Sequence, residues 1–158
     1  ATNFQNNFVV SGLPIDVQRL QKALSKINVT SQLLPVCYGF HSKLIDPIER
    51  EFRFLAQNIK ISPNTIPIVS SRTADVIDEL NEEHFWEVIR YPVNFELTVV
   101  DMLKRGNYTF IDLGPSGSLA TIVKNILPPT SPSISMPILN QFGRDLSAIE
   151  RLQSSLCL

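Results

Sequence analysis

The chain has 158 residues, of which 44% are hydrophobic and 18% are charged. This composition supplies enough apolar side chains for a packed core and argues against a disordered protein. The formal net charge is −1 and no basic stripe stands out, so we expect no nucleic-acid partner. No apolar run approaches the roughly 20 residues that a membrane-spanning helix needs, so we also expect no membrane partner.

The start of the chain and its cysteines predict a compartment. Residues Ala1 to Phe4 show neither the charged segment nor the apolar stretch of a signal peptide. Cys37 and Cys157 have neither the spacing of a metal site nor that of a disulfide framework. We therefore expect reduced thiols and a cytoplasmic protein.

The first forty residues predict a small α+β unit. Phe8 to Gly12 is a short apolar segment closed by glycine, which indicates a strand. From Pro14 to Asn28, apolar residues recur at steps of three and four, which predicts a helix with one apolar face. Ser31 to Phe40 is again extended and apolar, so we expect a second strand there.

From Lys43 onward, helical and strand-like patterns alternate along the chain. The predicted helices span residues 43–57, 82–90, 94–105 and 119–127, and a last helix is predicted to begin at Gly143. The predicted strands span residues 66–71, 108–114 and 134–138. Alternation of this kind is typical of a mostly parallel α/β sheet.

His41 lies where the strand predicted to end at Phe40 meets the helix predicted from Lys43. Side chains of active sites are often held at such corners. A lone histidine beside apolar residues is more often structural, so the residue alone leaves both roles open. Cys37 precedes His41 by four residues, about 13 Å along an extended strand. That separation is too large for a nucleophile–base pair.

The segment Gly114 to Ser118 lies at a second predicted corner, where a Gly-x-Ser-x-Gly nucleophile elbow would belong. Its last position is serine rather than glycine, and Pro115 restricts the turn. We therefore favour a tight turn in which Ser116 or Ser118 caps the next helix. Asp112 could orient a histidine, but a strand-terminal aspartate is more often a turn acceptor. Neither a phosphate-binding glycine motif nor the residue spacing of a metal site is present.

Four segments carry a resemblance to a known family. They are Ala1-Thr2-Asn3 through Val9-Val10-Ser11-Gly12, Phe40-His41-Ser42, Tyr91-Pro92-Val93-Asn94-Phe95, and Ile111-Asp112-Leu113-Gly114-Pro115 with Leu119. In this order and spacing they resemble the malonyl-CoA:acyl carrier protein acyltransferases, in the version built into polyketide synthases. Each segment alone is a weak signal, whereas four in order are fairly specific. The resemblance covers roughly residues 1 to 140 and matches the C-terminal half of the family's domain.

The resemblance implies an α/β fold, with an α/β-hydrolase-like large subdomain, present in part, and part of a ferredoxin-like small subdomain. Residues 1–42 would form the second half of the small subdomain, 43–140 the C-terminal part of the large one, and 141–158 a C-terminal helix or a linker. The family's Gly-His-Ser-x-Gly serine and its substrate-binding arginine belong to the N-terminal half, which is absent here. We therefore expect that missing half to be a partner and the chain alone to be inactive.

The resemblance also implies a two-step acyl transfer. The family's serine attacks an acyl-CoA thioester while a histidine, matched here by His41, accepts its proton as general base. The same histidine then activates the phosphopantetheine thiol of an acyl carrier protein. The residue after Pro-Val orients the histidine through its main-chain carbonyl, and Asn94 occupies that place. Acyl-CoA is thus the expected substrate and the acyl carrier protein the expected partner, with no bound cofactor and no metal.

In this family the residues just before the histidine set the choice of acyl group, so Tyr38 and Phe40 are expected to line the acyl pocket. Phe40 resembles malonyl-type sites, because its ring crowds an α-substituent, whereas Tyr38 resembles the other class. Two alternatives stay open. One is an acyl hydrolase in which water replaces the thiol. The other is a non-catalytic α/β interaction module in which His41 is structural.

Overall fold

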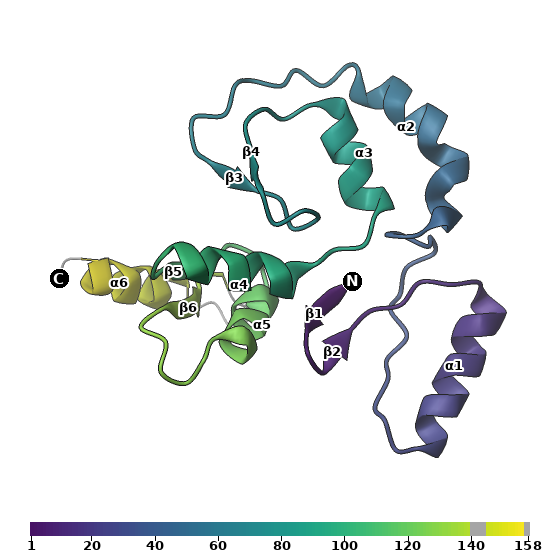
Figure 1. Cartoon of the computed structure of the whole chain (residues 1–158), viewed down its shortest axis with the longest axis horizontal. Helices are drawn as coiled ribbons and strands as arrows, with labels where there is room; N and C mark the ends of the chain where they lie inside the picture. Colours follow the sequence, from purple (N-terminus) through teal and green to yellow (C-terminus); the bar gives the residue numbers. More distant parts are fainter. Residues whose placement is uncertain (140–144, 157–158) are drawn as a thin grey trace. The chain divides into compact units, whose positions relative to one another are not determined.

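The computed structural model describes residues 1–139 and 145–156. The chain divides into two compact units, Ala1–Thr98 and Val99–Leu158. Figure 1 shows the helices and strands of both units, coloured along the sequence. The boundary between the two expected subdomains, after residue 42, stays a prediction.

The first unit begins with a small antiparallel hairpin, β1 (Thr2–Phe4) and β2 (Asn7–Phe8). The strand predicted over Phe8 to Gly12 is therefore wrong beyond Phe8, because residues 9–12 lie in no strand. A helix, α1 (Pro14–Lys26), follows as predicted, and Pro14 occupies its first turn, where no backbone N–H is needed. None of the side chains of α1 is buried, so its apolar face is uncovered within the part of the chain that the structure describes.

The run from Ser31 to Phe40 contains no strand, contrary to the prediction. Its apolar side chains are exposed, with exposed fractions of 61% at Leu33 and 58% at Val36. A strand forms by pairing its backbone N–H and C=O groups with those of a neighbour. No described strand pairs with this run. The pattern of the sequence is that of a strand, but its pairing partner is not among the described residues.

Two helices and a short 3-10 helix form the centre of the first unit. The 3-10 helix η1 (Lys43–Ile48) leads into α2 (Glu49–Ala56), and α3 (Glu82–Arg90) packs against both. One continuous helix was predicted here. Pro47 explains the difference, because it has no N–H to donate to an α-helical hydrogen bond.

The packing of these elements buries Ile45 and Trp86, which are 2% and 4% exposed. The ring of Trp86 on α3 lies beside that of Phe52 on α2, with 5.6 Å between the ring centroids. Such aromatic pairs contribute about 0.5–1.5 kcal/mol beyond the area that they bury. The α2–α3 contact therefore holds α3, and the chain that follows it, in place.

Arg53 joins α2 and α3 at their surface. It donates to both carboxylate oxygens of Glu83, at 2.5 and 3.1 Å, and to Glu49 one turn earlier at 2.8 Å. The hydrogen bonds from Arg53 hold the pKa of Glu83 below its usual range, and the same bonds raise the pKa of Arg53. Because Glu83 faces solvent, this pair contributes little to stability.

A second hairpin, β3 (Ile68–Val69) and β4 (Val76–Ile77), completes the first unit. The strand predicted over residues 66–71 is confirmed at its centre, whereas β4 was not predicted. The predicted helix over 94–105 is confirmed as α4 (Phe95–Arg105), which begins in the first unit and continues into the second.

The second unit contains a parallel pair of strands, β5 (Thr109–Asp112) and β6 (Ile134–Pro137). The helix α5 (Ser118–Ile126) connects them and packs against both, as alternation of strands and helices predicts. The last helix, α6, spans Asp145–Leu156. It was predicted from Gly143, which lies outside the described residues.

The two faces of this small sheet differ in exposure. Ser135 on β6 donates to the carbonyl of Ala120 on α5 and is 8% exposed, so this face is covered by α5. On the opposite face, Ile111 and Ile134 are 41% and 46% exposed. Parallel sheets normally have both faces covered, so the second face lacks its cover within residues 1–139 and 145–156. Across the same ranges, none of the helices has the length and apolar character needed to cross a membrane.

Candidate active site

The candidate site is built around His41 in the first unit. His41 adopts a left-handed backbone conformation with φ of 59°, which is unusual for a residue with a side chain. Backbone of this kind costs about 1–3 kcal/mol and persists only where its surroundings fix it. Residues held in this way occur often at functional sites, so the strain supports the choice of His41 as a candidate.

Two main-chain carbonyls hold His41. Its backbone N–H donates to the carbonyl of Ile89 at 2.8 Å, and its ring nitrogen Nδ1 lies 3.1 Å from the carbonyl of Tyr91. A carbonyl oxygen only accepts, so this contact requires the proton on Nδ1. In the neutral imidazole Nε2 is then left with a free lone pair, which is the state of a histidine that acts as a base.

The carbonyl that contacts Nδ1 thus belongs to Tyr91. The resemblance had implied the carbonyl of Asn94, three residues further on, instead. The carbonyl of Asn94 accepts two hydrogen bonds from Thr98, one from its backbone N–H at 3.1 Å and one from its side-chain hydroxyl at 3.0 Å. The Asn94 backbone N–H donates to Ser71 at 2.8 Å. In this structure Asn94 therefore fixes the start of α4, and the contact with the imidazole is made by Tyr91.

The residues next to His41 are fixed by side-chain hydroxyls. Ser11 donates to the carbonyl of Phe40 at 2.6 Å. Ser42 donates to the carbonyl of Gly39 at 2.7 Å and accepts the backbone N–H of Leu44 at 3.2 Å, so it caps η1. Gly39 allows this close turn, because a Cβ there would lie 2.8 Å from the Cβ of Leu44.

An arginine at the end of α3 joins this helix to η1. Arg90 donates to both carboxylate oxygens of Asp46, with Nη2 at 3.2 Å from Oδ2. The side chain of Arg90 is only 14% exposed. The guanidinium groups of Arg72 and Arg90 lie 4.8 and 5.2 Å from the centroid of the Tyr91 ring. The side chain of the residue that contacts the imidazole therefore makes two cation–π contacts of its own.

Tyr38 and Phe40, predicted to line an acyl pocket, lie near each other at the surface. Their rings meet edge to face with 6.1 Å between centroids, and their exposed fractions are 64% and 37%. Their place in an acyl pocket stays a prediction.

The second corner of the sequence forms a turn and not a nucleophile elbow. The residue with the left-handed backbone is Gly117, with φ of 65°, and not Ser116, whose hydroxyl lies 2.7 Å from that of Ser118. Asp112 is 6% exposed, and its two carboxylate oxygens accept the backbone N–H groups of Gly114 at 2.8 Å and Ala120 at 2.9 Å. Asp112 is thus a turn acceptor, as favoured from the sequence, and it fixes the start of α5.

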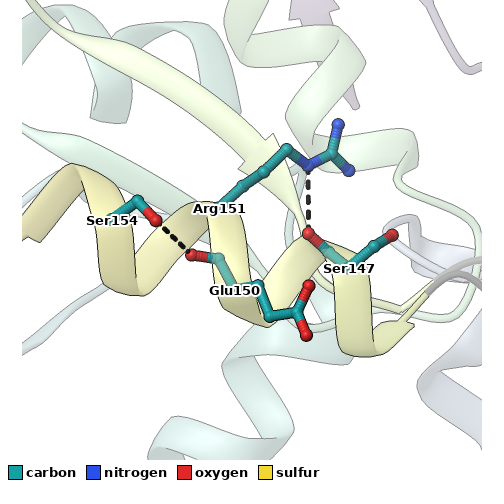
Figure 2. A pocket seen from close by; sticks show the side chains of 4 residues that line it. All are labelled: Ser147, Glu150, Arg151 and Ser154. Atoms are coloured by element: carbon teal, nitrogen blue, oxygen red, sulfur yellow. Dashed lines mark hydrogen bonds between the residues drawn. The ribbon is translucent and has the colours of Figure 1, made fainter.

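A shallow hollow lies on α6. Figure 2 shows its lining residues, Ser147, Glu150, Arg151 and Ser154, on one face of this single helix. Arg151 donates to the carbonyl of Ser147 at 3.2 Å, and Ser154 donates to that of Glu150 at 2.9 Å. These bonds stay within the helix, so the hollow carries no chemistry of its own. Among the described residues, no group of three or more His, Cys, Asp or Glu could hold a metal ion.

Comparison with solved structures defines the fold. A loading acyltransferase from the avermectin modular polyketide synthase matches 87% of this chain with a TM-score of 0.78 and 24% identity, over 44% of its own length. A malonyl CoA-acyl carrier protein transacylase from Clostridium perfringens matches 90% of this chain with a TM-score of 0.72 and 21% identity, over 43% of its own length. The fold is that of the acyltransferases, which confirms the predicted fold class.

Comparison of sequences gives the family, although no family model matches. The polyketide biosynthesis acyltransferase homolog BaeD of Bacillus velezensis is 35% identical over 159 residues, which cover 99% of this chain and 48% of BaeD. The chain belongs to the acyltransferase family of polyketide biosynthesis and corresponds to the C-terminal portion of its members. It spans about half the length of the curated relatives that it matches.

Proposed function

We propose that this chain is the histidine-bearing half of an acyltransferase that moves a malonyl-type acyl group from CoA to an acyl carrier protein. The observation that carries the proposal is the contact between Nδ1 of His41 and the Tyr91 carbonyl at 3.1 Å, made by a residue in a strained backbone conformation. The names of the family members, which are acyltransferases, support the same reaction class.

In the proposed reaction, Nε2 of His41 accepts the hydroxyl proton of a serine as that serine attacks the acyl-CoA thioester. The acyl group forms an ester with the serine, and CoA leaves as a thiol that carries the proton. In the second half-reaction Nε2 takes the proton of the pantetheine thiol, and the thiolate attacks the acyl-serine ester. The serine regains the proton, and His41 returns to its starting state.

The serine is not on this chain, because the sequence contains no Gly-His-Ser-x-Gly segment. We propose that the other half of the domain supplies the serine, the oxyanion hole and the arginine that binds the substrate carboxylate. The uncovered face of α1 and the exposed Ile111 and Ile134 of the small sheet support this, because each needs an apolar cover. The chain alone would then be inactive.

Tyr38 and Phe40 precede His41 directly and would meet the acyl group at the mouth of the completed site. Crowding by the Phe40 ring would favour malonyl over α-branched groups. The reaction needs no bound cofactor, since acyl-CoA is the substrate and the phosphopantetheine is carried by the partner protein. Reduced thiols and the substrates fit a cytoplasmic enzyme.

Intact mass spectrometry of the full-length protein, before and after addition of malonyl-CoA, tests the proposal. We expect a malonyl adduct on serine that disappears when holo-acyl carrier protein is added and reappears on that protein. In His41→Ala, acyl loading should slow by about 10²–10⁴-fold, the usual effect of losing a general base. The 158-residue chain alone serves as the control and should gain no adduct.

The other outcomes separate the alternatives. An adduct that is lost to water as fast without the carrier protein as with it identifies an acyl hydrolase, in which water takes the place of the thiol. A full-length protein that forms no adduct at all, or a His41→Ala variant that loads at the parent rate, identifies His41 as a structural residue and rejects the proposed function.

A further inference from the structure

Arg90 lies between the two residues whose carbonyls hold His41. The Ile89 carbonyl accepts the His41 backbone N–H at 2.8 Å, and the Tyr91 carbonyl lies 3.1 Å from Nδ1. Both acceptors belong to the end of α3, at residues 89 and 91. Any movement of this end of the helix therefore moves both contacts of His41 together.

The side chain of Arg90 ties that end of α3 to the segment that follows His41. Its Nε and Nη2 both donate to the carboxylate of Asp46, which lies in η1. A planar guanidinium that binds a carboxylate through two parallel bonds fixes orientation as well as distance. The Arg90 side chain is 14% exposed and that of Asp46 is 45% exposed, so the pair is shielded from water on the side of the arginine and open to it on the side of the carboxylate.

The same guanidinium also packs on Tyr91. Arg90 and Arg72 lie on the Tyr91 ring at 5.2 and 4.8 Å from its centroid, and Arg72 is paired in turn with Glu87 at 3.0 Å. Cation–π contacts of this kind are weak individually. They limit rotation of the residue whose carbonyl contacts the imidazole.

We propose that Arg90 is a positioning residue for His41. Its ion pair with Asp46 holds the Ile89 and Tyr91 carbonyls in place, and these keep the imidazole protonated on Nδ1 with Nε2 free. The consequence for catalysis rests on the proposed function, whereas the orientation of the imidazole can be measured without any acyl transfer.

The full 158-residue chain, labelled with ¹⁵N-histidine, provides the test by NMR at alkaline pH, where an imidazole is neutral. The chain has two histidines, so a His84→Gln variant assigns the signals. In the parent, His41 should show a protonated Nδ1 and an unprotonated Nε2. In Arg90→Gln and in Asp46→Ala, the two ring nitrogens should move toward the averaged shifts of mixed tautomers. Asp46→Glu should restore the parent pattern, because its carboxylate can still reach Arg90.

The matched control is Arg53→Gln, which breaks a different ion pair that involves α3, that of Arg53 on α2 with Glu83. It should leave the His41 signals unchanged. Folded Arg90→Gln and Asp46→Ala variants with parent-like His41 signals would overturn the proposal. So would an equal change in the Arg53→Gln control, or loss of folding in both test variants, since the pair would then support the fold in general.

The effect of Arg90 on catalysis is measured in a second experiment, on the full-length protein. Arg90→Gln should lower kcat for acyl loading by about 10- to 100-fold with little change in KM, the usual effect of a small misplacement of a reacting group. A parent protein that forms no acyl adduct would reject the proposed function and leave the NMR result to decide the role of Arg90. An altered tautomer with a parent-like kcat would overturn the catalytic consequence.

Discussion

Replacing Asp112 should destabilise the second unit, because this carboxylate satisfies two backbone groups at the start of α5. Oδ1 accepts the N–H of Gly114 at 2.8 Å, and Oδ2 accepts the N–H of Ala120 at 2.9 Å. Asp112 and Ala120 are 6% and 2% exposed, so water cannot replace the bond to Ala120. Asp112→Ala leaves that N–H buried without a partner.

The size of the effect follows from the two bonds. A buried donor that loses its partner costs about 1–3 kcal/mol. Gly114 is only half-buried, and water can take over part of its bond, so its loss adds less. We expect Asp112→Ala to lower the free energy of unfolding by about 2–4 kcal/mol, a large share of the roughly 5–15 kcal/mol of a typical domain. Asp112→Asn keeps one acceptor oxygen, so its free energy of unfolding should lie about halfway between those of the parent and Asp112→Ala.

Urea unfolding followed by far-UV circular dichroism measures the change, and amide hydrogen exchange locates it. The amides of Ala120 and the first turn of α5 should exchange faster, while those of α3 should not change. Asp101→Asn is the control for Asp112→Asn: it is the same substitution in the same unit, at a carboxylate that bonds only to Arg105 and Lys104 among the described residues. Parent-like unfolding and exchange in Asp112→Ala would refute the reasoning.

Three further predictions concern the first unit. Ser11→Ala removes the 2.6 Å bond to the Phe40 carbonyl, worth about 0.5–1.5 kcal/mol, so acyl loading in the full-length protein should slow by about 2- to 10-fold and Ser11→Thr should retain the rate. Phe40→Ser should relax the discrimination between malonyl-CoA and α-branched acyl-CoA in competition assays, and unchanged selectivity would count against a place in the acyl pocket. The pKa of Glu83 is lowered by its bonds to Arg53, so the pair stabilises the fold above the ordinary carboxyl pKa of 4.5 and this contribution is lost as the pH falls through the lowered value. Because this exposed pair contributes little to stability, the loss of Tm with acid should be only slightly steeper in the parent than in Glu83→Gln, and a shallower loss in the parent than in the variant would contradict the assignment.

The helices were predictable from the sequence because their signals are local. The apolar steps of three and four residues that define α1 (Pro14–Lys26) and α3 (Glu82–Arg90) lie within each helix, and their bounds agree with the prediction to within a few residues. The strand expected over Ser31 to Phe40 failed for the opposite reason. A strand depends on a neighbour, and the pattern of one segment does not reveal whether that neighbour is present.

The candidate site, like the fold, combines features that the sequence predicted with contacts that it did not reveal. His41 was predicted from the sequence, by its position and by the resemblance of Phe40-His41-Ser42 to a known signature, and its catalytic role stays a prediction. The Tyr91 carbonyl was missed because every residue has a main-chain carbonyl, so its role leaves no trace in residue type. Arg90 and Asp46 are 44 residues apart, and their pairing follows from the packing of α3 on η1 and not from any local pattern.

The cost of the backbone strain at His41 can be compared with the hydrogen bonds around it, and this comparison indicates which part of the candidate site is preformed. A left-handed conformation at His41 costs about 1–3 kcal/mol. The bonds from His41 to Ile89, from Ser11 to Phe40 and from Ser42 to Gly39 contribute about 0.5–1.5 kcal/mol each and offset a cost of this size. All of these contacts lie within the first unit. If His41 is the base that we propose, it can hold its orientation in this chain by itself. The proposed other half of the domain would then need to bring the serine to Nε2 but would not need to arrange the histidine.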